Sequence, residues 1–381
     1  MAAAVFVAVL YVYAHSFAAW SGARILPESS QQLDVVGLAL HATCVVREAV
    51  AGLNAHVKPR RIYVVTKGDC ETFTSFGPNV VCVLEDTLLP GFTKQDVAAA
   101  LDARIRSGDE HAAGVYKGRS MSGWYYQQLL KMGAGRHIEG LSDMFLLWDM
   151  DMVPLRPLTL FERRARSDPA PPDGVAPILR THRALLQVGG FVVGPYELSY
   201  ARLFDGAKVE YAKDHSSFVV HHMLIYKPVM EEILQSIERL DPNAWTAHNE
   251  TVSSLNADDV VARLMNATVP VRWPSTVLAS ANEHDFELGF SEYTTYASYA
   301  LQRHADLYAA ARRCTWKRYP YFSWISAAIR RYLLFDRAGP CCPSYPWLVL
   351  HRLLGFEFIG FEVGHSSALC LYDPAVPKYG L

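Results

Sequence analysis

The chain has 381 residues, of which 51% are hydrophobic and 19% charged, enough to build one large packed domain or two. Its 36 basic and 38 acidic side chains nearly balance and form no charge block, so we expect no nucleic-acid partner. With 24 glycines and 21 prolines, it is neither collagen-like nor a low-complexity chain.

The first twenty residues contain no Asp, Glu, Lys or Arg and are mainly apolar. Ala2–Ala14 is short for a membrane helix, which needs about 20 residues, but continuation to Trp20 gives just enough length. Ser21–Ala23 also has the small residues of a cleavage site. A cleaved signal, an amino-terminal anchor and a buried helix are therefore all open. We favour residues 1–23 as a signal peptide or anchor, and a location in the Golgi or endoplasmic reticulum lumen, as a type II membrane protein if the segment is retained.

The seven cysteines lack Cys-x-x-Cys spacing, which argues against a zinc or redox motif. In an oxidising lumen some of them would pair, and the odd number leaves at least one unpaired or intermolecular. The glycosylation triplets at Asn249 and Asn266 agree with this route. The cysteines are Cys44, Cys70, Cys82, Cys314, Cys341, Cys342 and Cys370.

Strand and helix patterns alternate from residue 33 onward. The pattern predicts strands at 33–40, 61–69 and 79–86, with a helix at 44–53 between the first two. Strand, helix and strand at this pitch indicate a parallel sheet with crossover helices. Ligands bind beyond the carboxyl ends of such strands. Lys67 and Asp69 follow the second strand, at one of these ends.

The segment Ser122–Met132 predicts a helix that Ser122 caps and that carries an apolar face. We expect the glycine-rich segment Gly133–Gly140 to end it. This segment is not a dinucleotide fingerprint, because it follows a helix and Ile138 occupies the position of the third glycine.

Downstream, Arg163–Gly174 predicts an exposed loop, and Leu186–Pro195 a strand in which Gly189 and Gly190 allow close backbone approach. A helix follows from residue 227, with Pro228 in its first turn. We predict one catalytic domain at 31–312 and an aromatic-rich extension at 313–381 packed on it.

The segment L-L-W-D-M-D-M-V-P ends an apolar strand with two carboxylates. Residues two apart on a strand face the same side, so Asp149 and Asp151 are expected to aim together and Met150 away from them. Pro154 and Pro157 then break the ladder. Two convergent carboxylates repel each other, so a divalent cation is their natural partner, and oxygen ligands favour Mn²⁺ or Mg²⁺. The alternative is a solvated turn.

W-D-M-D-M-V-P-L-R-P resembles the metal-binding D-x-D segment of nucleotide-sugar-dependent glycosyltransferases of the GT-A fold. S-G-W-Y-Y-Q-Q-L-L-K upstream and F-S-E-Y-T-T-Y downstream resemble a poorly characterised group in that class, over roughly residues 33 to 300. The resemblance implies an α/β, GT-A-like (Rossmann-related) fold with a mostly parallel sheet flanked by helices. It also implies a nucleotide-diphosphate sugar donor and a glycan, protein or lipid acceptor.

The resemblance further implies a role for the acidic pair. Asp149 and Asp151 would hold Mn²⁺ or Mg²⁺ on the donor diphosphate, so that Asp151 takes part in catalysis through the metal. Some members of the class complete the metal with a downstream histidine, and we expect His365 in V-G-H-S-S to do so, ahead of the three other histidines considered. These are His221, His222 and His284.

For the donor, the resemblance implies contacts from Lys67, Asp69, Gln128 and Lys131, with the sugar lined by Gly189 and Gly190. Glu292 is the candidate carboxylate near the acceptor hydroxyl and a candidate general base. Each has an alternative: Lys131 as an exposed helix residue, the glycines as a bulge, Glu292 as a cap or ion pair. An aromatic group could form an acceptor platform or simply pack in the core; its members are Trp316, Tyr319, Tyr321, Phe322 and Trp324.

The sequence therefore favours a hexosyltransferase-type enzyme. Two alternatives stay open: a non-catalytic sugar- or nucleotide-binding module of the same fold, and a metal-dependent phosphohydrolase. The phosphohydrolase usually needs more ligands or a second metal.

Overall fold

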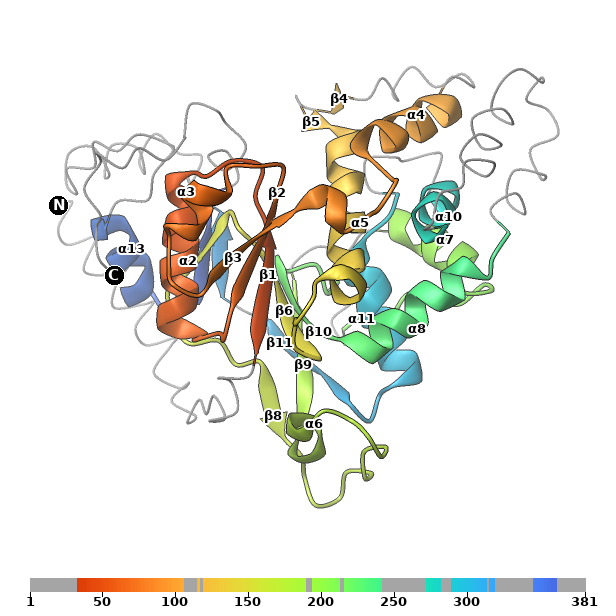
Figure 1. Cartoon of the computed structure of the whole chain (residues 1–381). Coiled ribbons are helices and arrows are strands. Elements are labelled where there is room, and N and C mark those ends of the chain that lie inside the picture. Colours follow the sequence, from red (N-terminus) through yellow and green to blue (C-terminus); the bar gives the residue numbers. More distant parts are fainter. Residues whose placement is uncertain are drawn as a thin grey trace, which may run out of the picture. The chain divides into compact units, whose positions relative to one another are not determined.

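The computed structural model describes residues 33–105, 115–116, 119–189, 194–212, 216–241, 272–281, 289–313, 315–318 and 345–361 (Figure 1). The chain divides into two compact units, which are described separately below. Unit 1 comprises 1–82, 148–161 and 314–381, and unit 2 comprises 83–147 and 162–313. The predicted leader, both glycosylation triplets, His284, Gly190 and His365 lie outside the described residues. The predicted boundaries at 31–312 and 313–381 stay predictions.

The main sheet has five strands in the order β10-β6-β1-β2-β3. These are β1 (Asp34–Leu38), β2 (Ile62–Thr66), β3 (Val80–Leu84), β6 (Met144–Asp149) and β10 (His222–Tyr226). Strands β1 and β2 are parallel, with Val35 opposite Ile62, and both read as unbroken apolar runs because both faces are covered. The predicted α/β class with a mostly parallel sheet is confirmed.

In unit 1, α2 (Cys44–His56) begins where Thr43 Oγ1 accepts the Val46 N–H at 3.3 Å. The helix packs against β7 (Met152–Pro154), which forms a small sheet in the order β12-β13-β7. Its other strands are β12 (Trp316–Arg318) and β13 (Phe358–Gly360), and α13 (Tyr345–Leu353) covers it. The buried cluster that joins these elements comprises Val45, Val153, Leu155, Trp347, Leu348, Phe356, Ile359 and Phe361.

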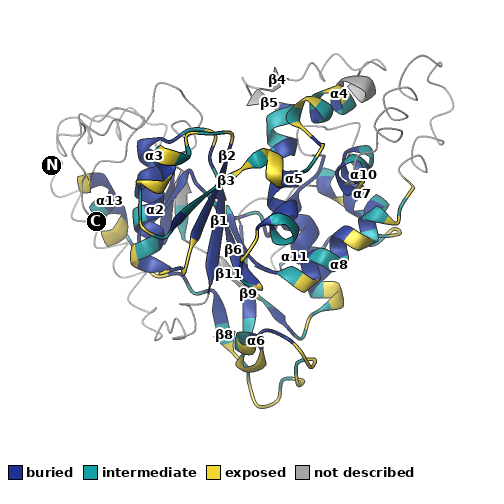
Figure 2. Ribbon diagram, viewed as in Figure 1, coloured by how far each residue is buried: buried dark blue, intermediate teal, exposed yellow. Residues whose placement is uncertain are grey.

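Unit 2 is mainly helical. Its longest described helix, α5 (Met121–His137), contacts α4 (Lys94–Ile105), α8 (Lys227–Glu238) and α11 (Glu292–Arg303). Helix α10 (Trp273–Ser280) contacts both α8 and α7 (Pro195–Leu203). Figure 2 shows α8 with one buried and one partly exposed side, as expected for an amphipathic surface helix.

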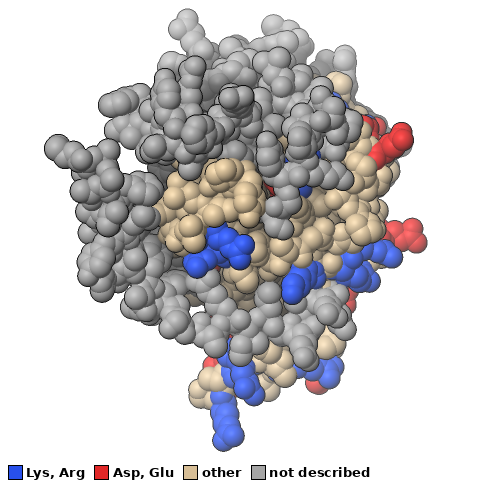
Figure 3. Space-filling model, turned by 90° about the vertical axis from the view of Figure 1, so that its left-hand side faces the viewer, with Lys and Arg blue, Asp and Glu red and all other residues tan. Residues whose placement is uncertain are grey.

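A second sheet has three strands in the order β11-β9-β8, and all of its residues except Phe161 belong to unit 2. It consists of β8 (Phe161–Arg163), β9 (His182–Val188) and β11 (Tyr308–Arg313), and α6 (Pro177–Thr181) precedes β9. A hairpin of β4 (Val115–Tyr116) and β5 (Arg119–Ser120) precedes α5, while α3 (Cys70–Thr74) and the 3-10 turn η3 (Glu85–Thr87) flank β3. Figure 3 shows the described Lys and Arg side chains of one face scattered among uncharged residues.

The segment Gly133–Gly140 ends α5 as predicted, but the helix is longer than the predicted Ser122–Met132. The helix continues through Gly133 and Gly135 to His137. A Cβ at Gly133 would lie 3.0 Å from the carbonyl oxygen of Leu88, and one at Gly135 would lie 3.5 Å from the Phe145 ring. Gly133 therefore allows close packing inside the helix, whereas a Cβ at Gly135 would make an ordinary contact. The chain turns at Gly140, where φ is +69°.

Other predicted elements agree in part with the structure. Pro228 lies in the first turn of α8, and most of Arg163–Gly174 is exposed, as predicted. The strand predicted at 186–195 is β9, which starts earlier and ends at Val188, and α7 begins at Pro195. Proline at the first position of a helix has no backbone N–H to lose there.

Candidate active site

The acidic pair lies at the end of β6, in unit 1. Asp149 is the last residue of the strand, and Met150 and Asp151 form the turn that leads into β7. The alternation of side chains on a strand therefore applies to Asp149, whereas the turn sets the direction of Asp151. Asp149 is half-buried, and Asp151 is 7% exposed.

Contacts on both sides hold this turn in place. The indole Nε1 of Trp148 donates to the carbonyl oxygen of Met152 at 2.8 Å, and the Phe361 N–H donates to the carbonyl oxygen of Asp151 at 2.8 Å. The buried Met150 side chain packs on β1 at Gly37, where an added Cβ would lie 2.3 Å from its Sδ. The backbone that carries the two carboxylates is thus fixed to β1 and β13.

The metal predicted for this pair stays a prediction. Mg²⁺ and Mn²⁺ take one or two protein carboxylates and complete their shell with phosphate oxygens and water. Within the described ranges, no group of three or more His, Cys, Asp and Glu side chains is arranged for a metal. Of the other histidines considered, His222 is buried on β10 and its Nδ1 lies 3.2 Å from the Val220 oxygen, and His221 precedes that strand.

The loop after β2 carries the next two predicted residues, both exposed. Asp69 has a left-handed backbone with φ +62°, and its Oδ1 accepts the Thr72 hydroxyl at 2.5 Å. Thr66 Oγ1 donates to the Gly68 carbonyl at 3.1 Å. Because short polar side chains bond the backbone and each other, Lys67 lies on a locally ordered loop.

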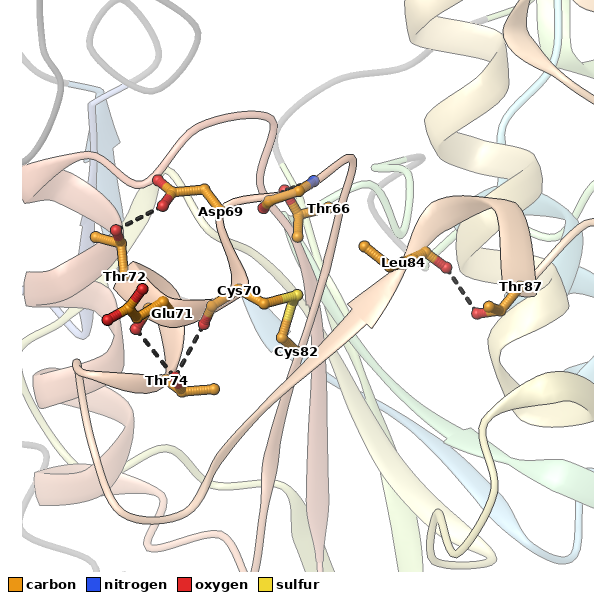
Figure 4. The surroundings of a disulfide bond; sticks show 10 residues. Thr66, Asp69, Cys70, Glu71, Thr72, Thr74, Cys82, Leu84 and Thr87 are labelled. Atoms are coloured by element: carbon orange, nitrogen blue, oxygen red, sulfur yellow. Dashed lines mark hydrogen bonds between the residues drawn. A yellow bond between two sulfur atoms is a disulfide. The ribbon is translucent and has the colours of Figure 1, made fainter.

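A disulfide fixes the far end of this loop. Cys70, the first residue of α3, is bonded to Cys82 in β3, with 5.3 Å between their Cα atoms (Figure 4). Cys44 is also disulfide-bonded. The predicted secretory route stays a prediction.

In unit 2, two predicted residues form a buried ion pair. Lys131 Nζ on α5 lies 2.7 Å from Glu292 Oε1 at the start of α11, and their side chains are only 3% and 6% exposed. The ammonium also donates to the Tyr293 hydroxyl at 3.3 Å and lies 4.5 Å from the centre of its ring. The alternative of an exposed Lys131 is therefore wrong.

Gln128, one turn earlier on α5, joins the same cluster. Its Oε1 accepts the backbone N–H of Glu292 at 3.1 Å, and Ser291 caps α11 by accepting the Thr294 N–H. Tertiary structure thus brings Gln128, Lys131 and Glu292 together, while their functional roles stay predictions. Tyr293 was missed, although it follows Glu292 directly in the motif F-S-E-Y-T-T-Y.

The glycine predicted to allow close approach does so. Gly189 donates its N–H to the Ser217 carbonyl at 2.7 Å, and an added Cβ would lie 2.1 Å from the Val219 oxygen. Trp316 stacks on Phe358 at 5.8 Å, a packing contact within the β12-β13 pair, and the other four aromatic candidates lie outside the described residues.

One tyrosine on α5 has a raised pKa. Burial raises the pKa of Tyr126 well above its usual value, and Glu85, Asp86 and Asp96 add to this. Its hydroxyl is neutral at physiological pH, as that of an ordinary tyrosine would be.

Within the described ranges no helix has the length and hydrophobicity needed to cross a membrane.

Comparison with known proteins identifies a family. No curated protein sequence matches the chain significantly. Among solved structures, the apo form of mouse xyloside xylosyltransferase 1 is similar at 9% sequence identity and a TM-score of 0.35, covering 90% of this chain and 100% of that one. Similarity at this level does not identify a function. The family described as "Family of unknown function (DUF6492)" matches residues 53–319, most of the chain, and the protein therefore belongs to that family.

Proposed function

We propose that this protein is a metal-dependent glycosyltransferase that moves a sugar from a nucleotide-diphosphate sugar to a glycan, protein or lipid acceptor. The observation that carries the proposal is the acidic turn Asp149–Asp151 at the end of β6, packed against β1 through Met150 and Gly37. In the order β10-β6-β1-β2-β3 the chain runs from β1 outward to β3 and then returns on the other side of β1. Open α/β sheets bind ligands where the strand order reverses in this way.

The loop after β2 supplies the second part of the proposed donor site. Strands β1 and β2 are parallel, so their carboxyl ends share one edge of the sheet, and Gly37 near the end of β1 contacts the acidic turn. Lys67 would pair with a phosphate oxygen of the donor, and Asp69 would accept hydrogen bonds from hydroxyls of the nucleoside. The disulfide and the Asp69–Thr72 bond order this loop before the ligand binds, which lowers the entropy lost on binding.

Asp149 and Asp151 would hold Mn²⁺ or Mg²⁺, which when bound neutralises a diphosphate and helps it to leave. The chain contributes the position of both carboxylates, through the bonds that Trp148 and Phe361 make across the turn. In unit 2 we assign Glu292 as the candidate base for the acceptor hydroxyl, with Lys131 orienting its Oε1. We also propose a lumenal location in the secretory pathway, supported by the disulfide.

A donor panel with and without manganese tests this function. The wild-type protein should bind uridine or guanosine diphosphate by calorimetry and should transfer or hydrolyse a nucleotide sugar only with the metal. Asp149→Asn and Asp151→Asn should each weaken metal-dependent nucleotide binding by more than about tenfold, a loss of at least ~1.4 kcal/mol. Asp173→Asn, an exposed aspartate in a loop, is the matched control and should behave as the wild type.

Three outcomes are distinguishable. Binding and turnover that both depend on the acidic pair support the proposal. Nucleotide binding without turnover for any donor would favour a non-catalytic binding module instead. A wild-type protein that neither binds a nucleoside diphosphate nor turns over a donor would refute the proposed function.

A further inference from the structure

Two polar atoms in the buried cluster of unit 2 lack hydrogen-bond partners within the described part of the chain. Gln128 is 2% exposed, and its Nε2 is buried without a partner. Among the hydrogen bonds of the described residues, the Glu292 carboxylate accepts through Oε1, from Lys131, and its Oε2 takes part in none of them. A free donor and a free acceptor therefore lie at the first turn of α11.

The orientation of the Gln128 amide is determined by its neighbour. The backbone N–H of Glu292 can only donate, so the atom 3.1 Å from it must be the amide oxygen, and the NH₂ group occupies the other position. The unpartnered atom of Gln128 is thus a hydrogen-bond donor. The unpartnered atom of Glu292 is a carboxylate oxygen, which accepts.

A hydrogen-bond donor and an acceptor together indicate which chemical group of a ligand would bind here. A hydroxyl both accepts and donates, so one hydroxyl satisfies Gln128 Nε2 and Glu292 Oε2 together. A phosphate or carboxylate would be repelled by Glu292, and an ammonium would face the Gln128 donor with no acceptor and would lie close to Lys131. The uncharged hydroxyl is the group that fits both atoms.

The cluster is built to hold these atoms in place. Lys131 and Tyr293 fix one oxygen of the carboxylate, and the backbone of α11 fixes the amide. Leaving a buried polar atom without a partner costs about 1–3 kcal/mol. The Gln128 donor bears this cost in the described part of the chain, and a ligand that accepts its hydrogen bond would remove it.

We propose that Gln128 Nε2 and Glu292 Oε2 form a hydroxyl-binding pair that recognises a sugar. Gln128 and Glu292 contact the sugar, and Lys131 and Tyr293 are positioning residues. The assignment of the hydroxyl to a sugar rests on the proposed function; the need for a hydroxyl rests on the two atoms alone. The pair thus gives unit 2 a carbohydrate contact of its own.

Saturation-transfer NMR on the full chain tests this pair, with the methyl glycosides of glucose, galactose, mannose and xylose as probes. Gln128→Met keeps the length of the side chain and removes the donor, and it should weaken glycoside binding at least tenfold. Gln128→Glu keeps an acceptor for the Glu292 N–H and also removes the donor, which covers a failure of the methionine variant to fold. Gln127→Leu, half-buried one position earlier on α5, is the matched control and should bind within twofold of wild type.

The proposal is overturned if the wild type binds none of the four glycosides or if the folded Gln128 variants bind as tightly as Gln127→Leu. A crystal structure at saturating glycoside in which a water molecule satisfies both atoms would also overturn it. Titration of the same samples with uridine diphosphate and Mn²⁺ reports the proposed function separately. If the protein binds the nucleotide but no glycoside, only this inference is refuted. If it binds a glycoside through Gln128 but no nucleotide, only the proposed function is refuted.

Discussion

Replacing Lys131 by methionine tests how the buried ion pair contributes to stability. The substitution keeps most of the aliphatic side chain and removes the ammonium, which leaves the Glu292 carboxylate in a position where its side chain is 6% exposed. Removing one partner of a buried pair costs about 3–5 kcal/mol, because the other charge stays buried without compensation. We expect Lys131→Met to lower the free energy of unfolding by this amount.

A second substitution separates charge from shape. Adding Glu292→Leu to Lys131→Met removes the carboxylate that would otherwise be buried without a partner charge. The hydrogen bond from the backbone N–H of residue 292 to Gln128 can remain. Replacing both members of a buried pair by apolar residues is often neutral or stabilising. The double variant should therefore recover to within about 1 kcal/mol of the wild type while losing the proposed acceptor carboxylate.

Guanidinium unfolding followed by tryptophan fluorescence measures both changes, with an unchanged m-value as the condition for comparing midpoints. Lys94→Met on α4, half-buried in the same unit, is the matched control and should change stability by less than about 1 kcal/mol. If Lys131→Met lowers the free energy of unfolding by less than about 1 kcal/mol, the Glu292 carboxylate is not left buried without a compensating charge. A double variant as unstable as the single one would show that packing, and not charge, decides the effect.

Three further substitutions test other parts of unit 1. Replacing Cys70 and Cys82 by serine should lower the free energy of unfolding by about 3 kcal/mol in denaturant titrations, since the bond closes a loop with a sequence separation of 12. Gly37→Ala should cost about 1–3 kcal/mol through overpacking against Met150, and should weaken metal-dependent nucleotide binding because the acidic turn must move. Burial, with a contribution from a nearby arginine, lowers the pKa of His56, so the unfolded state takes up the proton first. Stability should therefore be full above about pH 6.5 and fall as pH drops below it, with a shallower fall in His56→Gln.

Each of these predictions has its own control. Dithiothreitol should destabilise the wild type more than the serine variant, and equal effects would contradict the role of the Cys70–Cys82 bond. Gly68→Ala has no atom within 4 Å of the new Cβ and should be neutral; a loss as large as that of Gly37→Ala would contradict the packing argument. An unchanged slope of stability between pH 7 and 5 in His56→Gln would exclude this histidine as the titrating group.

Local sequence patterns predicted the positions of the strands well, and the structural roles of single residues less well. Runs of β-branched residues located β1, β2 and β3, because a strand covered on both faces needs continuous apolar sequence. The segment Gly133–Gly140 ends α5 as expected, but Gly133 itself lies inside the helix and packs on a backbone oxygen of Leu88, which is distant in the sequence. A glycine permits either outcome, and only the neighbouring chain decides between them.

By itself the sequence determined that this is an α/β protein and that two aspartates follow a buried strand, since both depend on periodicity within a few residues. Only the tertiary structure decided that Lys131 meets Glu292 in the core, that Gln128 holds the start of α11, and that Cys70 pairs with Cys82. The physical reason is the range of the interactions. Hydrogen bonding within a helix or along a strand is local, whereas ion pairs and disulfides join whichever residues the packing of helices and sheets brings within reach.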